Sequence, residues 1–186
     1  MFNYNFNNYA PRNPRYSRNA YQKHMLELWE ENALCIKYVI DYSMSDVNVY
    51  QEMSTRLNKN LKTIADIFVK LYGDSDLINQ LFNNVGNLVL MCIDSIRWRK
   101  DLAKFRSEWY KYVDSLVSHL HEFVDSNVRE LFYKQMRLIE GLVVSFLNKN
   151  AKEMNDYCYN QLLTNNRVLS MTLFNGLVNN NKKVFV

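Results

Sequence analysis

The sequence has few of the residues that sheet-rich proteins need. Its 186 residues include only four glycines and two prolines, while 48% of them are hydrophobic. Because sheets require many tight turns, this scarcity favours long helices with short connections. No apolar run reaches the roughly eighteen residues of a membrane span, and no apolar leader follows the start. We therefore expect one domain with a sizeable core, without a span or secretory signal.

Cysteine is also scarce. The three residues Cys35, Cys92 and Cys158 are odd in number and widely and unequally spaced within helical patterns. Disulfide frameworks and zinc sites need paired or closely spaced cysteines. The cysteines are therefore expected to be reduced core thiols, and the chain is expected in the cytoplasm.

Common catalytic patterns are missing. The sequence has no Gly-x-Ser-x-Gly elbow, no glycine-rich phosphate loop and no Cys-x-x-Cys pair. It also lacks the Glu-x-x-His pairs of carboxylate-bridged metal sites in helical bundles. The histidines are expected at the periphery: His24, His119 and His121. We predict a protein that is not an enzyme and has no metal or cofactor.

What the sequence does contain is helical periodicity. Apolar residues recur every three or four positions, which predicts an all-α fold, a single bundle of about five long and two short helices. The expected helices span about 21–42, 45–57, 61–71, 77–96, 101–123, 127–146 and 151–178. The expected organisation is an extended arm at 1–20, the bundle at 21–178 and a tail at 179–186.

One short pattern occurs twice. Leu57-Asn58-Lys59-Asn60-Leu61-Lys62 resembles Leu147-Asn148-Lys149-Asn150-Ala151-Lys152, and each is expected to join two helices. Asparagine tolerates left-handed backbone geometry and caps helices, so it suits such a joint. Either two joints converged by chance, or the bundle consists of two pseudo-repeated helical hairpins.

Amide side chains interrupt the apolar stripes. Asn32, Gln135 and Asn165 each take an inward position on a different expected helix, and Asn87 lies at the border of its stripe. A buried amide without partners costs about 1–3 kcal/mol. Facing amides can satisfy one another and set the register of the helices. The alternative is that they line a pocket for a small ligand or a metal.

The first twenty residues differ from the rest. They carry three of the four net positive charges and no acid, which makes the remainder nearly neutral. They are also unusually aromatic for a solvated tail. We predict an extended arm that docks on other protein subunits, the alternative being a disordered leader. The residues expected to bind are Phe2, Tyr4, Phe6, Tyr9, Arg12, Arg15 and Arg18. The Val-Phe-Val end of the tail is a second candidate docking segment.

A second basic stretch lies in the body. Its cations alternate with aromatic residues, a pattern that can bind nucleic acid or lie on an anionic membrane surface. The near-neutral body favours a simpler interpretation, a solvent-facing side of an amphipathic helix. The cations are Arg97, Arg99, Lys100, Lys104 and Arg106.

A further set of residues is scattered across about 26–178: Leu28-Trp29-Glu30, Arg56-Leu57, Tyr72-Gly73, Trp109-Tyr110, Asp114, Tyr133 and Gly176-Leu177-Val178. In these residues the chain resembles a family of small all-helical proteins of spore-forming bacteria, some of them mislabelled as kinases. It implies a helical bundle with histidines at positions 32, 87 and 135. This chain has amides there, and amides coordinate transition metals poorly.

The expected function follows from these features. We predict a structural or adaptor bundle whose terminal arms dock on other subunits in an assembly or homo-oligomer. The abundance of Asn, Tyr and Lys and the scarcity of Gly suggest an AT-rich genome. A bundle of bacterial type with added docking arms would suit a large DNA virus that uses the domain as a virion component. The alternatives are a bundle with a degenerate small-ligand or metal site and a nucleic-acid-associated protein with a basic arm.

Overall fold

The fold is all-α, as predicted. The computed structural model describes residues 17–72, 75–97, 102–120 and 127–180. Within these ranges the chain forms long helices and no strand. The elements are α1 (Arg18–Tyr42), α2 (Val47–Tyr72), α3 (Ser75–Arg97), α4 (Leu102–Leu120), α5 (Asn127–Leu147), α6 (Ala151–Asn155), a π-helical segment (Asp156–Leu162) and α7 (Leu163–Asn180).

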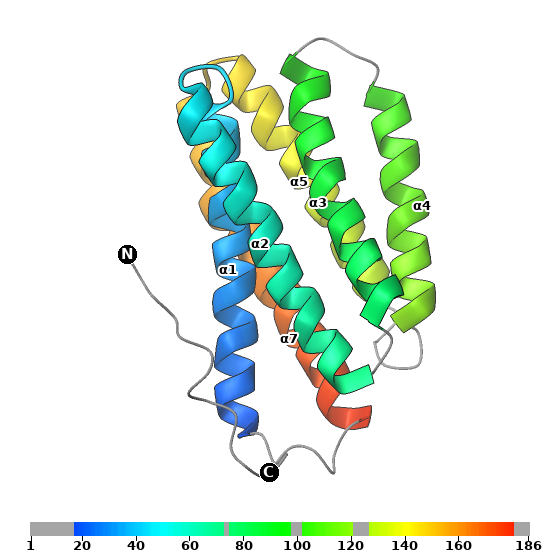
Figure 1. The fold of residues 1–186 in the computed structure, drawn as a ribbon. Helices are drawn as coiled ribbons and strands as arrows, with labels where there is room; N and C mark the ends of the chain where they lie inside the picture. Colours follow the sequence, from blue (N-terminus) through cyan, green and yellow to red (C-terminus); the bar gives the residue numbers. More distant parts are fainter. Residues whose placement is uncertain (1–16, 73–74, 98–101, 121–126, 181–186) are drawn as a thin grey trace.

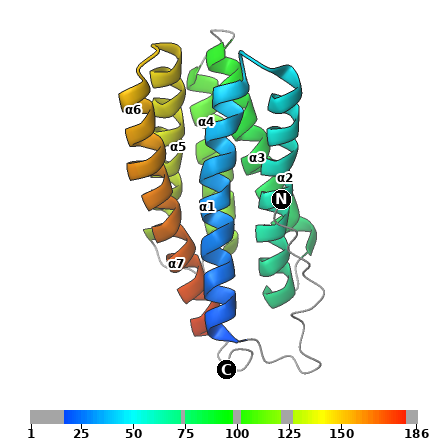
Figure 2. The same ribbon diagram turned by 90° about the vertical axis from the view of Figure 1, so that its left-hand side faces the viewer.

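Helices α1 to α5 run alternately up and down, and α6 continues into α7 in the direction opposite to α5, so that together they form a bundle (Figures 1 and 2). Each packs against the next along the chain, and α7 returns to pack against α1 and α5. α1 therefore lies between α2 and α7, and α5 lies between α4 and α7 while also contacting α1 and α3. None of the described helices is long and apolar enough to cross a membrane.

The first helix begins earlier than predicted. The Ser17 side chain accepts a hydrogen bond from the Ala20 backbone N–H, so α1 begins at Arg18, inside the range assigned to the arm. The carboxylate of Asp46, just before α2, accepts from the N–H groups of Asn48 and Val49. Residues 1–16 of the predicted arm lie outside the described residues.

The predicted helix break at Asn58-Lys59-Asn60 is wrong. α2 runs through it as one helix of 26 residues. Leu57, Leu61 and Ile64 are buried along this part of α2. The packing of this face outweighs the weak helix propensity of asparagine, a few tenths of a kcal/mol to about 0.7 kcal/mol per residue.

The two similar sequences consequently have different structures. The first lies in the interior of α2, whereas the second forms the turn between α5 and α6. At that turn Lys149 has a positive φ of 55°, and Asn150 caps α6 by accepting from the Glu153 N–H. Two equivalent joints were predicted, and only the second exists.

The final predicted helix contains an irregularity. A π-helical segment, Asp156–Leu162, separates α6 from α7, so the turns there are wider than in an α-helix. The helical spacing of Leu162, Asn165 and Leu169 would continue to Thr172 and Gly176, but these two are only part-buried, whereas Leu173 and Leu177 are buried. The buried face of α7 therefore follows the uninterrupted period as far as Leu169 and then moves to the neighbouring positions.

The core contains large aromatic side chains. Trp29 of α1 packs edge-on against Phe132 of α5, with ring centroids 6.0 Å apart. Phe68 of α2 packs against Phe82 of α3. A β-carbon on Gly86 of α3 would lie 2.8 Å from side-chain atoms of α2, so this glycine allows α2 and α3 to approach closely. Aromatic packing thus stabilises both the α1–α5 and the α2–α3 contacts.

Candidate functional site

The most distinctive chemical feature of the described structure is a buried network of amides. Asn32 of α1 donates from Nδ2 to Oδ1 of Asn60 on α2, at 3.2 Å. Asn60 donates in turn to the backbone oxygen of Leu28 on α1, at 2.9 Å. Both side chains are buried. The two hydrogen bonds therefore join α1 to α2 inside the core.

Asn166 of α7 is at the centre of the network. Its Nδ2 donates to the Trp29 backbone oxygen at 3.0 Å and lies 3.3 Å from Oδ1 of Asn32. Its Oδ1 accepts from Nε2 of Gln135 on α5, at 2.8 Å. Asn166 is fully buried. Through it, the network extends from α1 and α2 to α5 and α7.

The four predicted amides have different environments. Asn32 and Gln135 belong to the network. Asn165 is buried but donates elsewhere, to the Leu131 backbone oxygen at 3.1 Å. Asn87 is exposed on α3, so its predicted place in the cluster is wrong. The buried described residues of α3 follow a different stripe, which includes Ile78, Phe82, Gly86, Val89 and Ile93.

Sequence reasoning missed Asn60 and Asn166. Asn60 was assigned to a helix break, although it falls three residues from Leu57 and four from Ile64, the spacing of a helical face. Asn166 follows Asn165 directly, and the apolar stripe alone did not distinguish the two. Both residues lie at helical spacing from Leu162 and Leu169, so no signal in the sequence singled out Asn166.

Two buried amide oxygens, one in the network and one beside it, are unpaired among the described residues. Gln135 Oε1 and Asn165 Oδ1 are buried and have no hydrogen-bond partner within the described part of the chain. Each donor described above, by contrast, binds an oxygen of another helix. A hydrogen bond of this kind contributes about 0.5–1.5 kcal/mol net, and the loss of its partner costs more. The amides therefore act on the register and contacts of the helices.

Ion pairs at the surface lie on both sides of α1. Arg56 of α2 donates to Glu31 at 2.8 Å, and Arg167 of α7 donates to Glu30 at 2.6 Å. The hydrogen bond to Glu31 raises the pKa of Arg56. Because these side chains are partly exposed, each pair adds little stability, about 0–1 kcal/mol. The two ion pairs nevertheless join α1 to α2 and α1 to α7, the same pairs of helices that the buried amides join.

Two of the residues considered for chemistry lie in or near the core. Cys35 is a buried free thiol, and burial raises its pKa to about 11. Burial also lowers the pKa of His24, which is only part-buried. The side chains of Cys92 and Cys158 are outside the described residues. No group of three His, Cys, Asp or Glu residues in the described ranges is arranged to hold a metal.

The predicted basic face is only partly described. Lys104 and Arg106 are exposed on α4. The guanidinium of Arg106 pairs with Glu140 of α5 at 2.8 Å, a contact that links the two helices. Arg97 ends α3 and its side chain lies outside the described residues, as do Arg99 and Lys100. Arg106 is therefore exposed to solvent and also joins α4 to α5 within the molecule.

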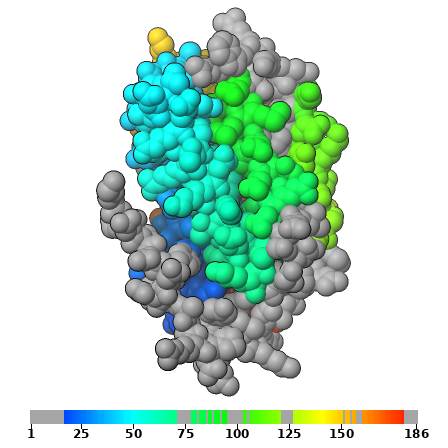
Figure 3. Space-filling model, viewed as in Figure 1, coloured from blue at the N-terminus to red at the C-terminus, as the bar shows by residue number. Residues whose placement is uncertain are grey.

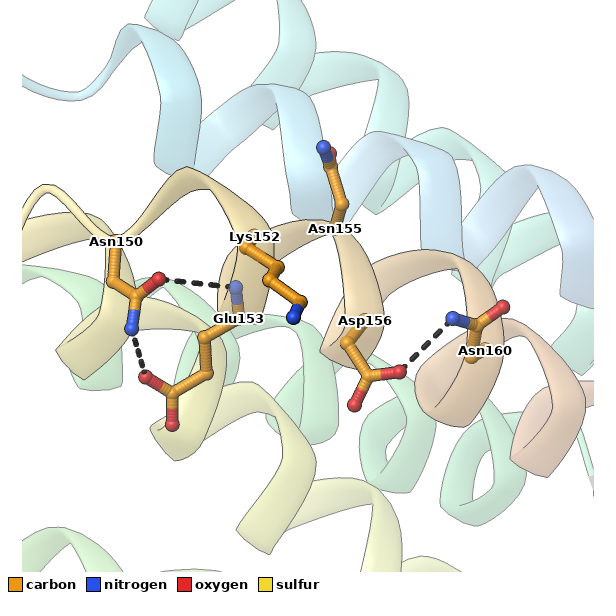
Figure 4. A pocket seen from close by; sticks show the side chains of 6 residues that line it. All are labelled: Asn150, Lys152, Glu153, Asn155, Asp156 and Asn160. Atoms are coloured by element: carbon orange, nitrogen blue, oxygen red, sulfur yellow. Dashed lines mark hydrogen bonds between the residues drawn. The ribbon is translucent and has the colours of Figure 1, made fainter.

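A shallow depression lies where α6 meets the π-helical segment (Figure 4). Asn150 and Glu153 hydrogen-bond with each other, and Asp156 accepts from Asn160 at 2.9 Å and from Gln161 at 3.0 Å. These contacts lower the pKa of Asp156. The side chains are exposed and satisfy one another locally, so the depression is not a buried binding pocket.

Exposed apolar side chains gather at one end of the bundle. Four of them surround the turn between α1 and α2: Tyr38, Tyr42, Met44 and Val47. The rings of Tyr38 and Tyr42 lie 6.4 Å apart. Figure 3 shows the start of α2, in cyan, at the surface of this end. We refer to these four side chains as the apolar turn. They lie within residues 38–47, across the end of α1, the turn and the start of α2.

Most of the predicted arm lies outside the described residues, including Phe2, Tyr4, Phe6, Tyr9, Arg12 and Arg15. Arg18 is described and is exposed at the start of α1. The tail residues 181–186 are also outside the described ranges. The roles assigned to these segments therefore stay predictions.

Comparison with family models, curated proteins and solved structures finds no match to this chain. The resemblance to helical proteins of spore-forming bacteria likewise stays a prediction.

Proposed function

We propose that this protein is a structural or adaptor subunit, a helical bundle that joins a larger assembly through its amino-terminal arm. The observation that carries the proposal is the amide network. Its donors bind oxygens of neighbouring helices, so the polar groups of the core serve the architecture of the bundle. Partner subunits would then be bound by the surface of the bundle and by the segments that extend from it.

The composition of the arm supports this role. It combines four aromatic residues within its first nine positions with arginines, and it contains no acidic residue. Aromatic and arginine side chains dominate the energetics of protein interfaces. The arm joins the bundle at the start of α1, where Ser17 caps the helix. It is therefore attached to a rigid helix and can act without altering the core.

Removal of residues 1–16 tests the proposal. This boundary keeps Ser17 and α1 intact, so helicity by circular dichroism and the unfolding midpoint should match those of the full chain. The size of the complexes in extracts of cells that make the protein is measured by size-exclusion chromatography. We expect the truncated chain to elute as an unassembled bundle. Complexes of unchanged size would contradict the proposal.

A further inference from the structure

We infer that the arm of one copy binds the apolar turn of a second copy. This inference rests on the proposed function and names the partner of the arm. The apolar turn has the exposure that such binding needs, since Met44 is 59% exposed and Val47 is 62% exposed. Its apolar side chains match the aromatic residues of the arm in kind.

The charges of the two segments are opposite. Residues 38–55, which contain the apolar turn, include Asp41, Asp46 and Glu52 and no lysine or arginine. Lys37 pairs with Asp41, so the negative charge that remains is that of Asp46 and Glu52. Both are exposed. The arm before Ser17 contains two arginines, Arg12 and Arg15, and no acid, and opposite charges on two surfaces favour association and set its orientation.

The apolar area of the arm is large enough for a stable interface. A buried aromatic side chain covers about 150–250 Å². The aromatic residues at positions 2, 4, 6 and 9 together can cover on the order of 600–1,000 Å². A stable interface buries about 800 Å² on each partner. The arm thus has enough apolar surface to sustain binding to the apolar turn and the helix surfaces beside it.

The positions of the two segments favour a second copy. The arm begins at one end of α1 and the apolar turn lies at the other, as Figures 1 and 2 show. The 25 residues of α1 separate them by about 37 Å. To reach its own turn, the arm would have to lie stretched along the whole helix. In a head-to-tail arrangement, the arm meets the turn of the next copy directly, and the contact repeats from copy to copy.

Sedimentation velocity of the purified full chain over a range of concentrations tests the inference. We expect concentration-dependent self-association that Met44→Gln with Val47→Gln weakens by about tenfold or more. Both side chains are mostly exposed, so the bundle should stay folded. The matched control is Val168→Gln, at an exposed apolar residue of α7, which should change association by less than about twofold.

A charge exchange adds a second test. Glu52→Lys should weaken association, as should Arg12→Glu with Arg15→Glu, and the combined variant should recover much of the loss because opposite charges face each other again. A combined variant that associates no better than either parent contradicts the inference.

Two further outcomes overturn the inference and differ in what they mean for the proposed function. If the turn variant associates like the full chain while removal of 1–16 prevents association, the arm binds elsewhere and the proposed function stands. If the purified chain stays monomeric, the arm does not bind a second copy. The proposed function then fails as well only if the complexes in extracts also persist without the arm.

Cross-linking of a mixture of isotope-labelled and unlabelled chains identifies which copy is bound. A photoreactive residue at position 6 should yield products that contain one chain of each kind. If all cross-links join two parts of the same chain, the arm binds its own turn, which overturns the inference.

Discussion

The side chain of Asn166 on α7 accepts a hydrogen bond from Gln135 on α5 at 2.8 Å, inside a core that is otherwise mostly apolar. The same asparagine donates to the backbone of α1. A single residue thus connects three helices that lie far apart in the sequence. Such bonds form only when neighbouring helices have one particular alignment along their axes. They therefore select one register among the several that apolar packing alone would allow.

Two adjacent asparagines provide a matched pair of substitutions. Asn166→Leu should destabilise the bundle by about 2–4 kcal/mol, because it leaves Nε2 of Gln135 and Oδ1 of Asn32 without these partners. Asn165→Leu should cost less than about 1 kcal/mol, because it removes one hydrogen bond to a backbone oxygen together with an Oδ1 that has no partner within the described residues. Urea unfolding measures both values, and equal costs would contradict the central place given to Asn166.

The contact between α1 and α2 can be tested by a double-mutant cycle. Asn32→Leu and Asn60→Leu should each destabilise the protein, whereas the double variant should be more stable than the sum of the two losses predicts. The expected coupling is about 1 kcal/mol or more, since either single variant leaves one amide buried without its partner. Additive losses would show that the 3.2 Å bond contributes nothing.

Tyr133 should titrate late. The pKa of Tyr133 is raised to about 12, mainly by burial and next by its hydrogen bond to Asp114. The raised pKa in the folded state means that its contribution to stability is present below pH 10 and is lost as the pH rises towards 12. Phenolate absorbance should show one tyrosine shifted upward, and Asp114→Ala should bring its pKa back towards 10. The same titration midpoint in both proteins would contradict this assignment.

Cys35 should be unreactive in the folded protein. With its pKa raised to about 11 by burial, almost none of it is thiolate at pH 8. In a variant with Cys92→Ser and Cys158→Ser, the reaction with a disulfide reagent should be slow in buffer and fast in denaturant. Rapid reaction of the folded variant would show that Cys35 is accessible.

The sequence predicted the fold class and part of the site for physical reasons. Met25, Trp29 and Ile36 recur at helical spacing, and the single polar exception among them, Asn32, was identified from that pattern. Asn60 was missed because local propensity marks an asparagine-rich stretch as a break, while its partners lie on another helix. Side-chain pairing between helices is a property of the tertiary structure, and local patterns in the sequence do not reveal it.

The end of the chain shows the same limit. Asn165 was chosen over Asn166 by continuing one helical period through residues 151–178. The π-helical segment Asp156–Leu162 interrupts that period, and no glycine or proline marks it in the sequence. Asn165 and Leu169 after it are still buried, but Thr172 is only part-buried and Asn166 is fully buried, which the single period did not indicate.

The most direct test of the proposed role changes only the aromatic residues of the arm. A variant with Phe2, Tyr4, Phe6 and Tyr9 all replaced by serine keeps the arginines and the whole described bundle. Light scattering coupled to size-exclusion chromatography gives the mass of the complexes that it forms beside those of the native chain. The account predicts the mass of an unassembled bundle with unchanged helicity. Complexes of native mass would contradict it.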